Sequence, residues 1–461
     1  MPLARSSSDS PASDAEHQDT RNQHSRTQDT ENHMSVDITN FNPFDPTTQQ
    51  CPFPHYAKMR EEAPVHPVSS IGVHMVTKHD LVMQVLRDPQ TYSSMFGGAG
   101  MPLSGPERER FAEVMSKGYP RVPTMLTADQ PEHTRYRRLV SRAFHPKVIA
   151  EMEPVVREIT VGLIESWIDK GRIEFVKEFA VPLPVRVIAK ALNVPDDRLA
   201  DFKRWSDDSI AGIGTNISID DRIKAEYGVN EFQHYFAEQI ELRRTHPQDD
   251  LLTNLLNATI DDDDPEVTDN RQLDMPEMLS IVQQLLVAGN ETTTKTLTEM
   301  IRLLAENPQE WAKLKADPSR AEKVMEETLR LSTPTQGMWR VVTKDTELGG
   351  VALKKGQRII IVFASANRDE DLFDEPDAFM PDREHLRDNL AFGKGIHFCL
   401  GANLSRLEGK VAAEELSKRL DSISLTSSNK FEYFPSFMLR GLTDLEIEFT
   451  PSEFSRTKVS A

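Results

Sequence analysis

Residues 392–401 read FGKGIHFCLG, a glycine-rich segment around one of the two cysteines of the chain. Gly393, Gly395 and Gly401 carry no side chain, so the backbone there can adopt positive φ and approach a large flat ligand closely. Cys399 directly precedes a predicted helix, whose free N–H groups and dipole favour a thiolate. A thiolate at this position can ligate iron and donate electron density that favours O–O cleavage. The alternative is a buried, inert cysteine in a glycine-rich turn.

A second polar segment, residues 288–293, reads AGNETT and interrupts the longest apolar helical pattern of the chain. Asp274 and Pro276 mark the start of that pattern, which predicts a central, buried helix over 275–306, about 45 Å long. A carboxylate and a hydroxyl in such a helix are costly unless they have partners or a function. The alternative is a threonine-rich turn whose hydroxyls bond to the carbonyl groups of the helix itself.

The segment 392–401 resembles the haem-binding loop of the cytochrome P450 family, whose pattern is Phe-x-x-Gly-x-x-x-Cys-x-Gly. The resemblance covers the chain from about residue 42 to 450 and points to the soluble bacterial members, those of actinobacteria in particular. It implies a mainly α fold with small β-sheets, in which one large helical domain encloses haem b between a long central helix and the cysteine loop. Cys399 is then the axial ligand of the haem iron. The other expected haem contacts in these two segments are Ala288, Phe392, Gly395 and Gly401.

The resemblance also gives roles to two further sets of residues. Glu291 and Thr292 match the acid–alcohol pair that relays protons to dioxygen bound over the haem. Glu327 and Arg330 lie three residues apart on a predicted helix, where an acid and a guanidinium can meet. In the family such a pair is joined by an arginine, here Arg383, and locks the fold behind the cysteine loop. This second set is expected to be structural and not catalytic.

Two haem propionates require charge-assisted donors, for which arginine is well suited because of its forked geometry. His133 and Arg137 are four residues apart on a predicted helix and therefore face the same way. The resemblance places this pair on the propionates. It adds Arg340, which follows Trp339 in a predicted strand, and His397 of the cysteine loop.

Electrons must come from another protein, because the chain has no Gly-x-Gly-x-x-Gly fingerprint for a flavin or nicotinamide. We expect them to pass from NAD(P)H through a separate ferredoxin or flavodoxin-type donor. Basic residues around the cysteine loop are expected to form a local patch that steers an acidic donor. These are Arg135, Arg138, Arg142, Lys394, Arg406 and Lys410, and the first three are expected to be surface residues.

The sequence thus predicts a haem-thiolate monooxygenase that inserts one atom of O₂ into a hydrophobic small molecule. A sterol, a terpenoid or a fatty-acid-like molecule fits the apolar segments expected to line the pocket, and a steroid hydroxylase is one candidate. These segments are 91–126, 205–220, 287–288, 333–339 and 437–438. One alternative is a peroxide-driven or isomerising member of the same fold, and another is a non-catalytic haem-binding sensor. The acid–alcohol pair favours O₂ use and turnover.

The composition excludes several other classes of protein. The 461 residues carry 73 acidic against 54 basic side chains, a net charge of −19, which argues against a nucleic-acid binder. Two cysteines cannot build a disulfide scaffold or a zinc site of several thiolates. No apolar run approaches the roughly 18 residues of a membrane span. The sequence therefore predicts a cytoplasmic protein with no membrane span, and we expect a monomer.

Three regions are expected along the chain. Residues 1–40 are polar and carry a net charge of −4, from three arginines against seven acids, which predicts a disordered tail. Met34 precedes the first apolar pattern and is a candidate for an alternative translation start. Residues 41–455 form the catalytic domain, and residues 456–461 a disordered end.

Overall fold

The computed structural model describes residues 36–96, 103–260, 267 and 269–455. Most of the predicted tail (1–35) and the predicted C-terminal end (456–461) therefore lie outside the described residues. The helices are α2 (Pro46–Gln50), α3 (Phe53–Glu62), α4 (His79–Arg87), α5 (Gly105–Met115), α6 (Glu132–Ser141), α7 (Pro146–Glu151), α8 (Glu153–Trp167), α9 (Pro182–Ala191), α10 (Leu199–Ile210), α11 (Ile219–Thr245), α12 (Leu251–Leu256), α13 (Met275–Glu306), α14 (Pro308–Ala316), α15 (Ala321–Ser332), α16 (Phe363–Ala366) and α17 (Ala402–Arg419). The strands are β1 (Val65–Val68), β2 (Val73–Val76), β3 (Tyr92–Ser93), β4 (Arg172–Glu174), β5 (Met338–Val342), β6 (Thr346–Leu348), β7 (Val351–Leu353), β8 (Arg358–Ile361), β9 (Leu420–Leu425) and β10 (Glu446–Pro451).

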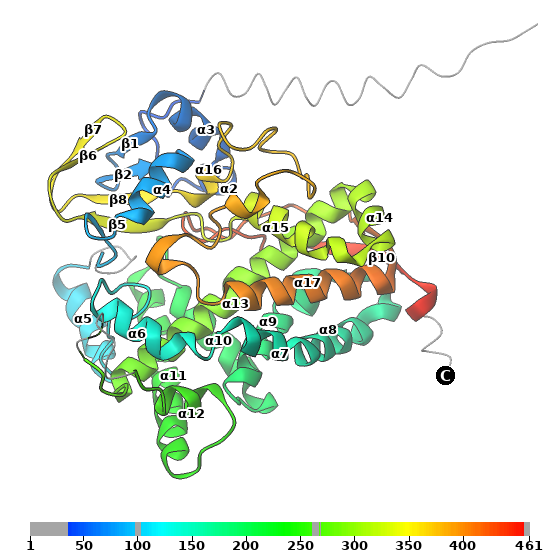
Figure 1. Cartoon of the computed structure of the whole chain (residues 1–461), viewed down its shortest axis with the longest axis horizontal. Coiled ribbons are helices and arrows are strands. Elements are labelled where there is room, and N and C mark those ends of the chain that lie inside the picture. The colour runs from blue at the N-terminus through cyan, green and yellow to red at the C-terminus, as the bar shows by residue number, and fades with distance from the viewer. Residues whose placement is uncertain (1–35, 97–102, 261–266, 268, 456–461) are drawn as a thin grey trace, which may run out of the picture.

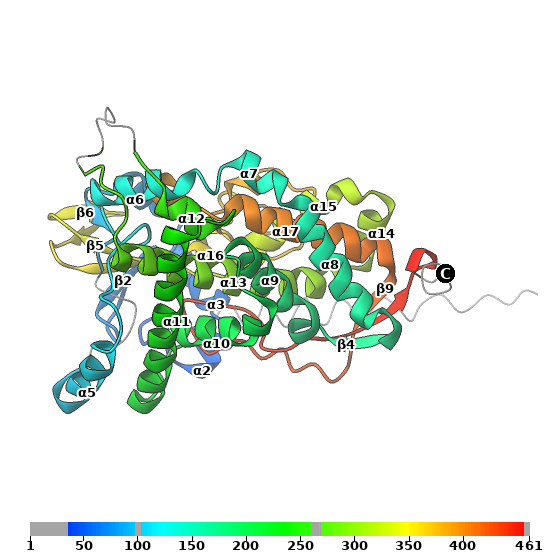
Figure 2. The same ribbon diagram turned by 90° about the horizontal axis from the view of Figure 1, so that it is seen from below.

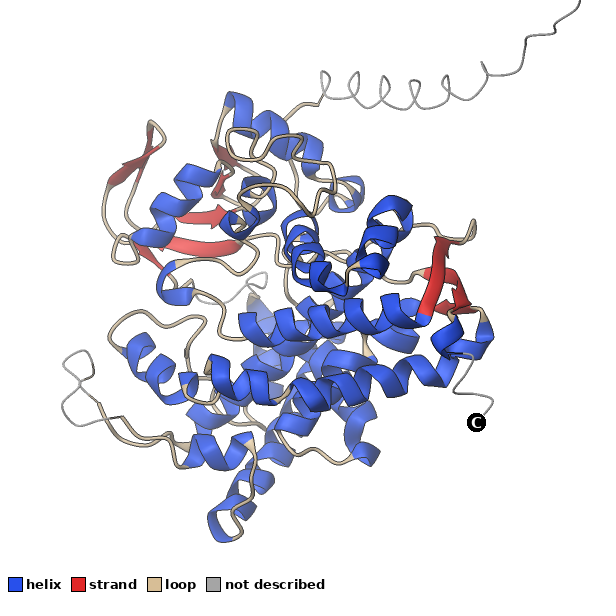
Figure 3. Cartoon of the chain, turned by 45° about the vertical axis from the view of Figure 1, so that its right-hand side comes forward, coloured by secondary structure: helices blue, strands red, loops and turns tan. Residues whose placement is uncertain are grey.

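The strands gather at two separated places beside a helical body (Figures 1 and 3). One group is a five-stranded sheet in the order β1-β2-β8-β5-β3, accompanied by the β6–β7 hairpin. The other is a three-stranded sheet in the order β4-β10-β9, next to the C-terminal end of α17. The predicted mainly α fold with small β-sheets is confirmed.

The five-stranded sheet is buried on both faces because its central strand alternates between two apolar clusters. Ile359 and Ile361 of β8 pack with residues of α4 in one cluster. Ile360, which points to the opposite face, packs with residues of α3 and with Phe437 in the other. This alternation is the period-2 geometry of a strand. Burial on both faces explains why the sequence of β8 is a short continuous apolar run. Strand β2 pairs with β8 in parallel.

Helix α13 runs through the middle of the helical body, as the sequence predicts. It begins with a capping box, in which the Asp274 side chain accepts from the Glu277 N–H and the Glu277 side chain accepts from the Asp274 N–H. Its 32 residues span about 48 Å at 1.5 Å per residue. Helices α9, α10, α15 and α17 all pack against it, which accounts for its apolar character on most faces.

The remaining helices place the cysteine loop beside this central helix. Helix α17 lies along α15 and α8, and the loop that leads into its N-terminus returns toward α13 (Figure 1). Seen from below, α5 and α11 lie side by side at one end of the molecule (Figure 2). No helix in the described ranges has the length and hydropathy needed to cross a membrane.

The sequence predicts that the folded domain begins at residue 41. In the structure, residues just before this boundary also pack on the domain. Ile38 is buried in the same apolar cluster as Phe41, Tyr56 and Met59. Its carbonyl oxygen also lies 2.9 Å from Nε2 of His66. Residues 36–40 therefore belong with the folded part of the chain, because Ile38 supplies apolar surface that the polar residues before it lack.

Candidate functional site

The cysteine loop has a conformation that depends on glycine. Gly393 and Gly395 have φ angles of 63° and 73°, in the left-handed region that favours this residue. A side chain on Gly395 would also place its Cβ 2.6 Å from the carbonyl oxygen of Leu86. The loop closes through the N–H of Cys399, which donates to the carbonyl oxygen of Phe392 at 2.9 Å. The positions of the glycines and of Cys399 in the motif are therefore those that this turn of the backbone requires.

The thiol of Cys399 lies at the N-terminus of α17 in an environment with opposing effects. Burial raises the pKa of the thiol above its ordinary value. The backbone N–H groups of Gly401 and Ala402 and the charges of Arg137 and Arg406 act in the opposite direction. For the metal-free thiol burial outweighs these donors, so the helix N-terminus alone does not produce the expected thiolate. A bound metal ion deprotonates a thiol ligand outright.

Four basic side chains from three elements meet next to this cysteine. The His133 ring of α6 lies 4.3 Å from the His397 ring of the cysteine loop, measured between centroids. Arg137, one turn after His133, interacts electrostatically with Cys399. Arg340 of β5 interacts electrostatically with His397. The structure thus brings together all four residues that the sequence assigned to the propionates.

The basic cluster contains more cationic groups than carboxylates, although Asp129 acts electrostatically on both His133 and Arg340. Burial lowers the pKa of His133 to about 4 and that of His397 to about 3, and the neighbouring cations contribute to both shifts. Burial also lowers the pKa of Arg340 to about 10. Nε2 of His133 is buried without a hydrogen-bond partner, and within the described residues neither Arg137 nor Arg340 forms an ion pair. An excess of cationic groups over carboxylates, with no ion pair to Arg137 or Arg340 among the described residues, fits a dianionic ligand such as haem b.

Helix α13 presents an opening in its otherwise buried middle. Ala288 is exposed and Thr292, one turn later, is partly exposed, whereas Asn290 and Glu291 are buried. The Thr292 hydroxyl donates to the carbonyl oxygen of Ala288 at 2.8 Å, the bond of the structural alternative considered for this segment. One face of the helix is therefore open where a buried helix is expected to touch protein. The uncovered face at Ala288 and the threonine beside it fit contact with a large planar ligand.

Behind the loop, a second polar group is completely enclosed. The Glu327 carboxylate of α15 accepts two hydrogen bonds from Arg330, each 2.8 Å long, and one from Nε of Arg383 at 3.1 Å. Arg330 also donates to the carbonyl oxygens of Asn367 and Pro376. Glu327 and Arg330 have no solvent exposure. The three residues meet as the sequence predicts and join α15 to the segment before the cysteine loop.

Phe392, the first residue of the motif, is fixed by an arginine. The Arg406 guanidinium lies 4.5 Å from the centre of the Phe392 ring and also bonds to the buried Glu326 at 2.5 Å. Of the basic residues expected in the surface patch, Arg406 is thus engaged in packing the loop.

Arg135 is not a surface residue, contrary to the sequence-based expectation. It is only 4% exposed, and its Nη1 donates to the Glu277 carboxylate at 2.9 Å. Nε of Arg135 lies 3.4 Å from the Asp269 carboxylate. Because the partners lie more than 130 residues away in the chain, local helical spacing could not reveal that this arginine is buried. Arg138 and Arg142, in contrast, are exposed.

Two contacts of the site were not predicted from the sequence. Ser94 places its hydroxyl 2.9 Å from Nε2 of His397, and no pattern in the sequence marks this serine. Lys295 forms an ion pair with Glu291 at 2.7 Å. The spacing of four residues between the two charges was a readable signal for this pair.

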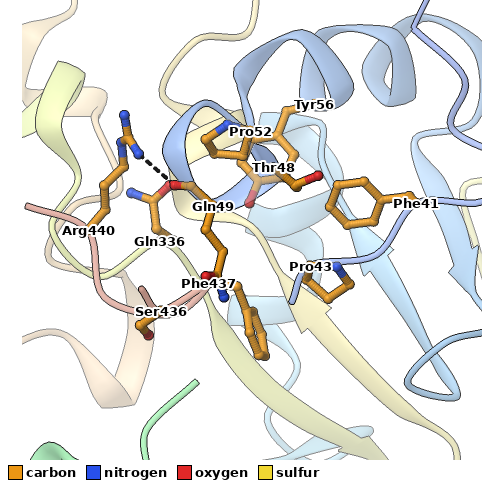
Figure 4. A pocket seen from close by; sticks show the side chains of 10 residues that line it. All are labelled: Phe41, Pro43, Thr48, Gln49, Pro52, Tyr56, Gln336, Ser436, Phe437 and Arg440. Atoms are coloured by element: carbon orange, nitrogen blue, oxygen red, sulfur yellow. Dashed lines mark hydrogen bonds between the residues drawn. The ribbon is translucent and has the colours of Figure 1, made fainter. Parts of the chain in front are cut away.

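A pocket elsewhere in the molecule is not lined by the candidate site residues. It encloses about 260 Å³ of space, part of it open to solvent. Figure 4 shows its lining, which includes the rings of Phe41, Tyr56 and Phe437 and the side chains of Gln336 and Arg440. None of its lining residues belongs to the cysteine loop, the basic cluster or the open face of α13. Phe437 connects it to the turn that the sequence assigns to the substrate pocket.

The chain is similar to several known proteins. The family model "Cytochrome P450" matches residues 218–422. A relative from Bacillus spizizenii, cytochrome P450 109, is 36% identical over 403 residues, which cover 87% of this chain and 92% of the relative. The vitamin D(3) 25-hydroxylase of Pseudonocardia autotrophica is 32% identical over 88% of this chain and 96% of its own length. A solved P450 from Bacillus megaterium in complex with testosterone aligns with a TM-score of 0.73 and 32% identity, covering 86% of this chain and 99% of that chain.

Proposed function

Because this chain belongs to the cytochrome P450 family of monooxygenases, we propose that it hydroxylates a hydrophobic small molecule with haem b held by Cys399 and the basic cluster. The observation that carries this proposal is the group of four basic side chains beside the cysteine, of which His133 and Arg340 are buried. When bound, the haem activates O₂ so that one oxygen atom enters a C–H bond of the substrate and the other leaves as water, with two electrons and two protons consumed.

The protein contributes the ligand, the anion site and a dry environment. Cys399 supplies the sulfur ligand, and the N–H groups of Gly401 and Ala402 point at that sulfur. His133, Arg137, Arg340 and His397 hold the propionates. Because a carboxylate removes the charge imbalance of this cluster, haem binding is expected to raise the pKa values of both histidines from their low values.

Protons for the reaction pass through the acid–alcohol pair of α13. Glu291 is a buried carboxylate between α13 and α10, and the partly exposed Lys203, 3.5 Å away, connects it to the surface from which protons enter. The Thr292 hydroxyl lies on the open face of the helix and can pass a proton toward the ligand when it turns away from Ala288. The bond to the carbonyl oxygen of Ala288 is then the resting position of this hydroxyl.

We expect Thr292→Ala to bind haem normally and to lose coupling between electron use and product. Product formed per NAD(P)H should fall about tenfold or more, and hydrogen peroxide should rise, because proton delivery is no longer directed. The measurement is the ratio of product and peroxide to NAD(P)H consumed. Thr298→Ala is the matched control, since Thr298 makes the same kind of bond, 2.9 Å to the carbonyl oxygen of Thr294, in a buried part of α13. An unchanged product ratio in Thr292→Ala would refute the relay.

The substrate that we propose is a steroid-like molecule. The P450 from Bacillus megaterium is described in complex with testosterone, and the Pseudonocardia autotrophica relative is a vitamin D(3) 25-hydroxylase. In this chain the turn at Phe437 and Met438 packs with Trp339 in an apolar cluster. Such apolar and sulfur-containing walls suit a rigid hydrophobic ligand. A shift of the haem Soret band on titration with steroids, compared with fatty acids, tests this assignment.

The electron donor that we propose is an acidic ferredoxin or flavodoxin-type protein that docks near the cysteine loop. Arg138 and Arg142 are exposed on and just after α6, the helix that carries His133 and Arg137. A local basic surface on a chain of net charge −19 attracts an acidic partner.

Arg138→Glu is expected to raise the KM for such a donor several-fold at low salt. The difference from wild type should shrink at high salt, because the screening length falls from about 10 Å at 0.1 M to about 3 Å at 1 M. Lys354→Glu is the charge-matched control, since Lys354 is 69% exposed and lies next to the β6–β7 hairpin. A KM that responds neither to Arg138→Glu nor to ionic strength would contradict docking at this surface.

A further inference from the structure

Glu291 takes part in a buried ion pair. Its carboxylate lies 2.7 Å from Nζ of Lys295, and both side chains are less than 10% exposed. A pair of charges at this depth loses much of its hydration and persists only where the surrounding structure holds it in good geometry. The question is which groups hold the pair in place and which way they orient the carboxylate.

The second cation near Glu291 is Lys203 of α10, which is farther from Glu291 than Lys295 and also pairs with another acid. Lys203 is 29% exposed and lies 3.5 Å from Glu291. It is also paired with Asp207 on its own helix. Asp207 is the acidic group that α10 brings to this network, so the charges that face Glu291 are Lys295, Lys203 and Asp207. Of the two lysines, Lys295 is closer, more deeply buried and not shared with Asp207 by an ion pair.

Lys295 is itself fixed by the turn at residues 434–441. Gly441 lies against its aliphatic stem, and a Cβ on Gly441 would overlap the Cβ and Cγ atoms of the lysine. The ammonium group is 5.4 Å from the centre of the Phe434 ring, within the range of a cation–π contact. The same turn carries Phe437 and Met438. A segment assigned to the substrate pocket thus touches the partner of the proton-relay acid.

We propose that Lys295 is a positioning residue that holds the Glu291 carboxylate in its ionised form, and that Gly441 and Phe434 hold Lys295 in turn. The inference rests on the proposed relay through Glu291 and Thr292. Although burial raises the pKa of Glu291, the charges of Lys295 and Lys203 outweigh it and hold the pKa below its ordinary value. Removal of Lys295 takes away the larger of the two lysine attractions that oppose burial, so the carboxyl then keeps its proton to higher pH.

The first test is an infrared titration of Glu291 in the haem-loaded protein, followed by the C=O stretch of the protonated carboxyl group. The band is assigned by its loss in Glu291→Gln. In Lys295→Met we expect the band to persist to a pH at least about one unit higher than in wild type, a tenfold change in proton affinity. Lys295→Arg should restore the wild-type titration. Gly441→Ala should shift it in the same direction as Lys295→Met, because the added methyl group displaces the lysine stem.

The second measurement is product formed per NAD(P)H as a function of pH, whose midpoint should move with the infrared titration. Lys313→Met is the matched control, since Lys313 forms a 2.7 Å ion pair with Glu310 on α14 and is not among the charges that act on Glu291. A wild-type titration of Glu291 in both Lys295→Met and Gly441→Ala overturns the proposal, as does an equal shift in Lys313→Met. If the titration shifts while the pH profile does not, Lys295 positions Glu291 but the relay through Glu291 fails.

Discussion

Cys399→Ser should abolish the strongly red-shifted Soret band of the reduced, CO-bound protein, and with it more than 99% of the monooxygenase activity. The red shift would require thiolate ligation by Cys399, and a serine hydroxyl cannot provide that electron density. The substitution removes little packing, because the loop is closed by a backbone hydrogen bond from residue 399 to the carbonyl oxygen of Phe392. We therefore expect Cys399→Ser to remain folded.

The second cysteine of the chain is the control for this experiment. Cys51 is exposed and lies at the C-terminal end of α2, so Cys51→Ser should leave the spectrum and the activity unchanged. Haem bound to the wild-type protein without the red shift would mean another axial ligand and would favour the haem-binding sensor. A wild-type protein that takes up no haem at all would contradict the interpretation of the basic cluster as a propionate site.

The sequence was sufficient for the elements whose geometry is local. The bounds of α13 follow from Asp274, Pro276 and an apolar pattern that continues for 32 residues. The turn of the cysteine loop follows from glycines that the observed φ angles require. The meeting of His133 with Arg137 follows from helical spacing. In each case the residues that decide the outcome lie within a few turns of one another.

Features that depend on distant partners could not be read in this way. Arg135 belongs to the same helix as Arg138, and the spacing of the two gives no reason to bury one and expose the other. Arg135 is buried because it bonds to Glu277 at the start of α13, which is 142 residues away in the sequence. Likewise, the contact of Gly441 with Lys295 depends on how the C-terminal turn packs on α13. Contacts between elements that are distant in the sequence depend on the tertiary structure, so local spacing in the sequence does not predict them.

Glu327→Gln should destabilise the protein more than any other single change considered for the structural residues. The carboxylate faces two arginines in a place without solvent, so its neutralisation leaves two buried positive charges with one fewer compensating group. Removal of one partner from a buried ion pair costs about 3–5 kcal/mol. We expect a loss of that size in the free energy of unfolding, seen as a lower urea midpoint. The N–H of Met380, which donates to Glu327 at 2.9 Å, should lose its strong acceptor as well.

The control for this prediction lies on the same helix. Glu322 is 60% exposed and pairs at 3.9 Å with Arg387, which is 72% exposed. Glu322→Gln should therefore change the free energy of unfolding by no more than about 0.5 kcal/mol. A loss of less than about 1 kcal/mol in Glu327→Gln would mean that the carbonyl oxygens around Arg330 compensate its charge without the carboxylate. Because Arg383 is anchored just before the cysteine loop, the expected destabilisation should also accelerate the release of haem from the folded protein.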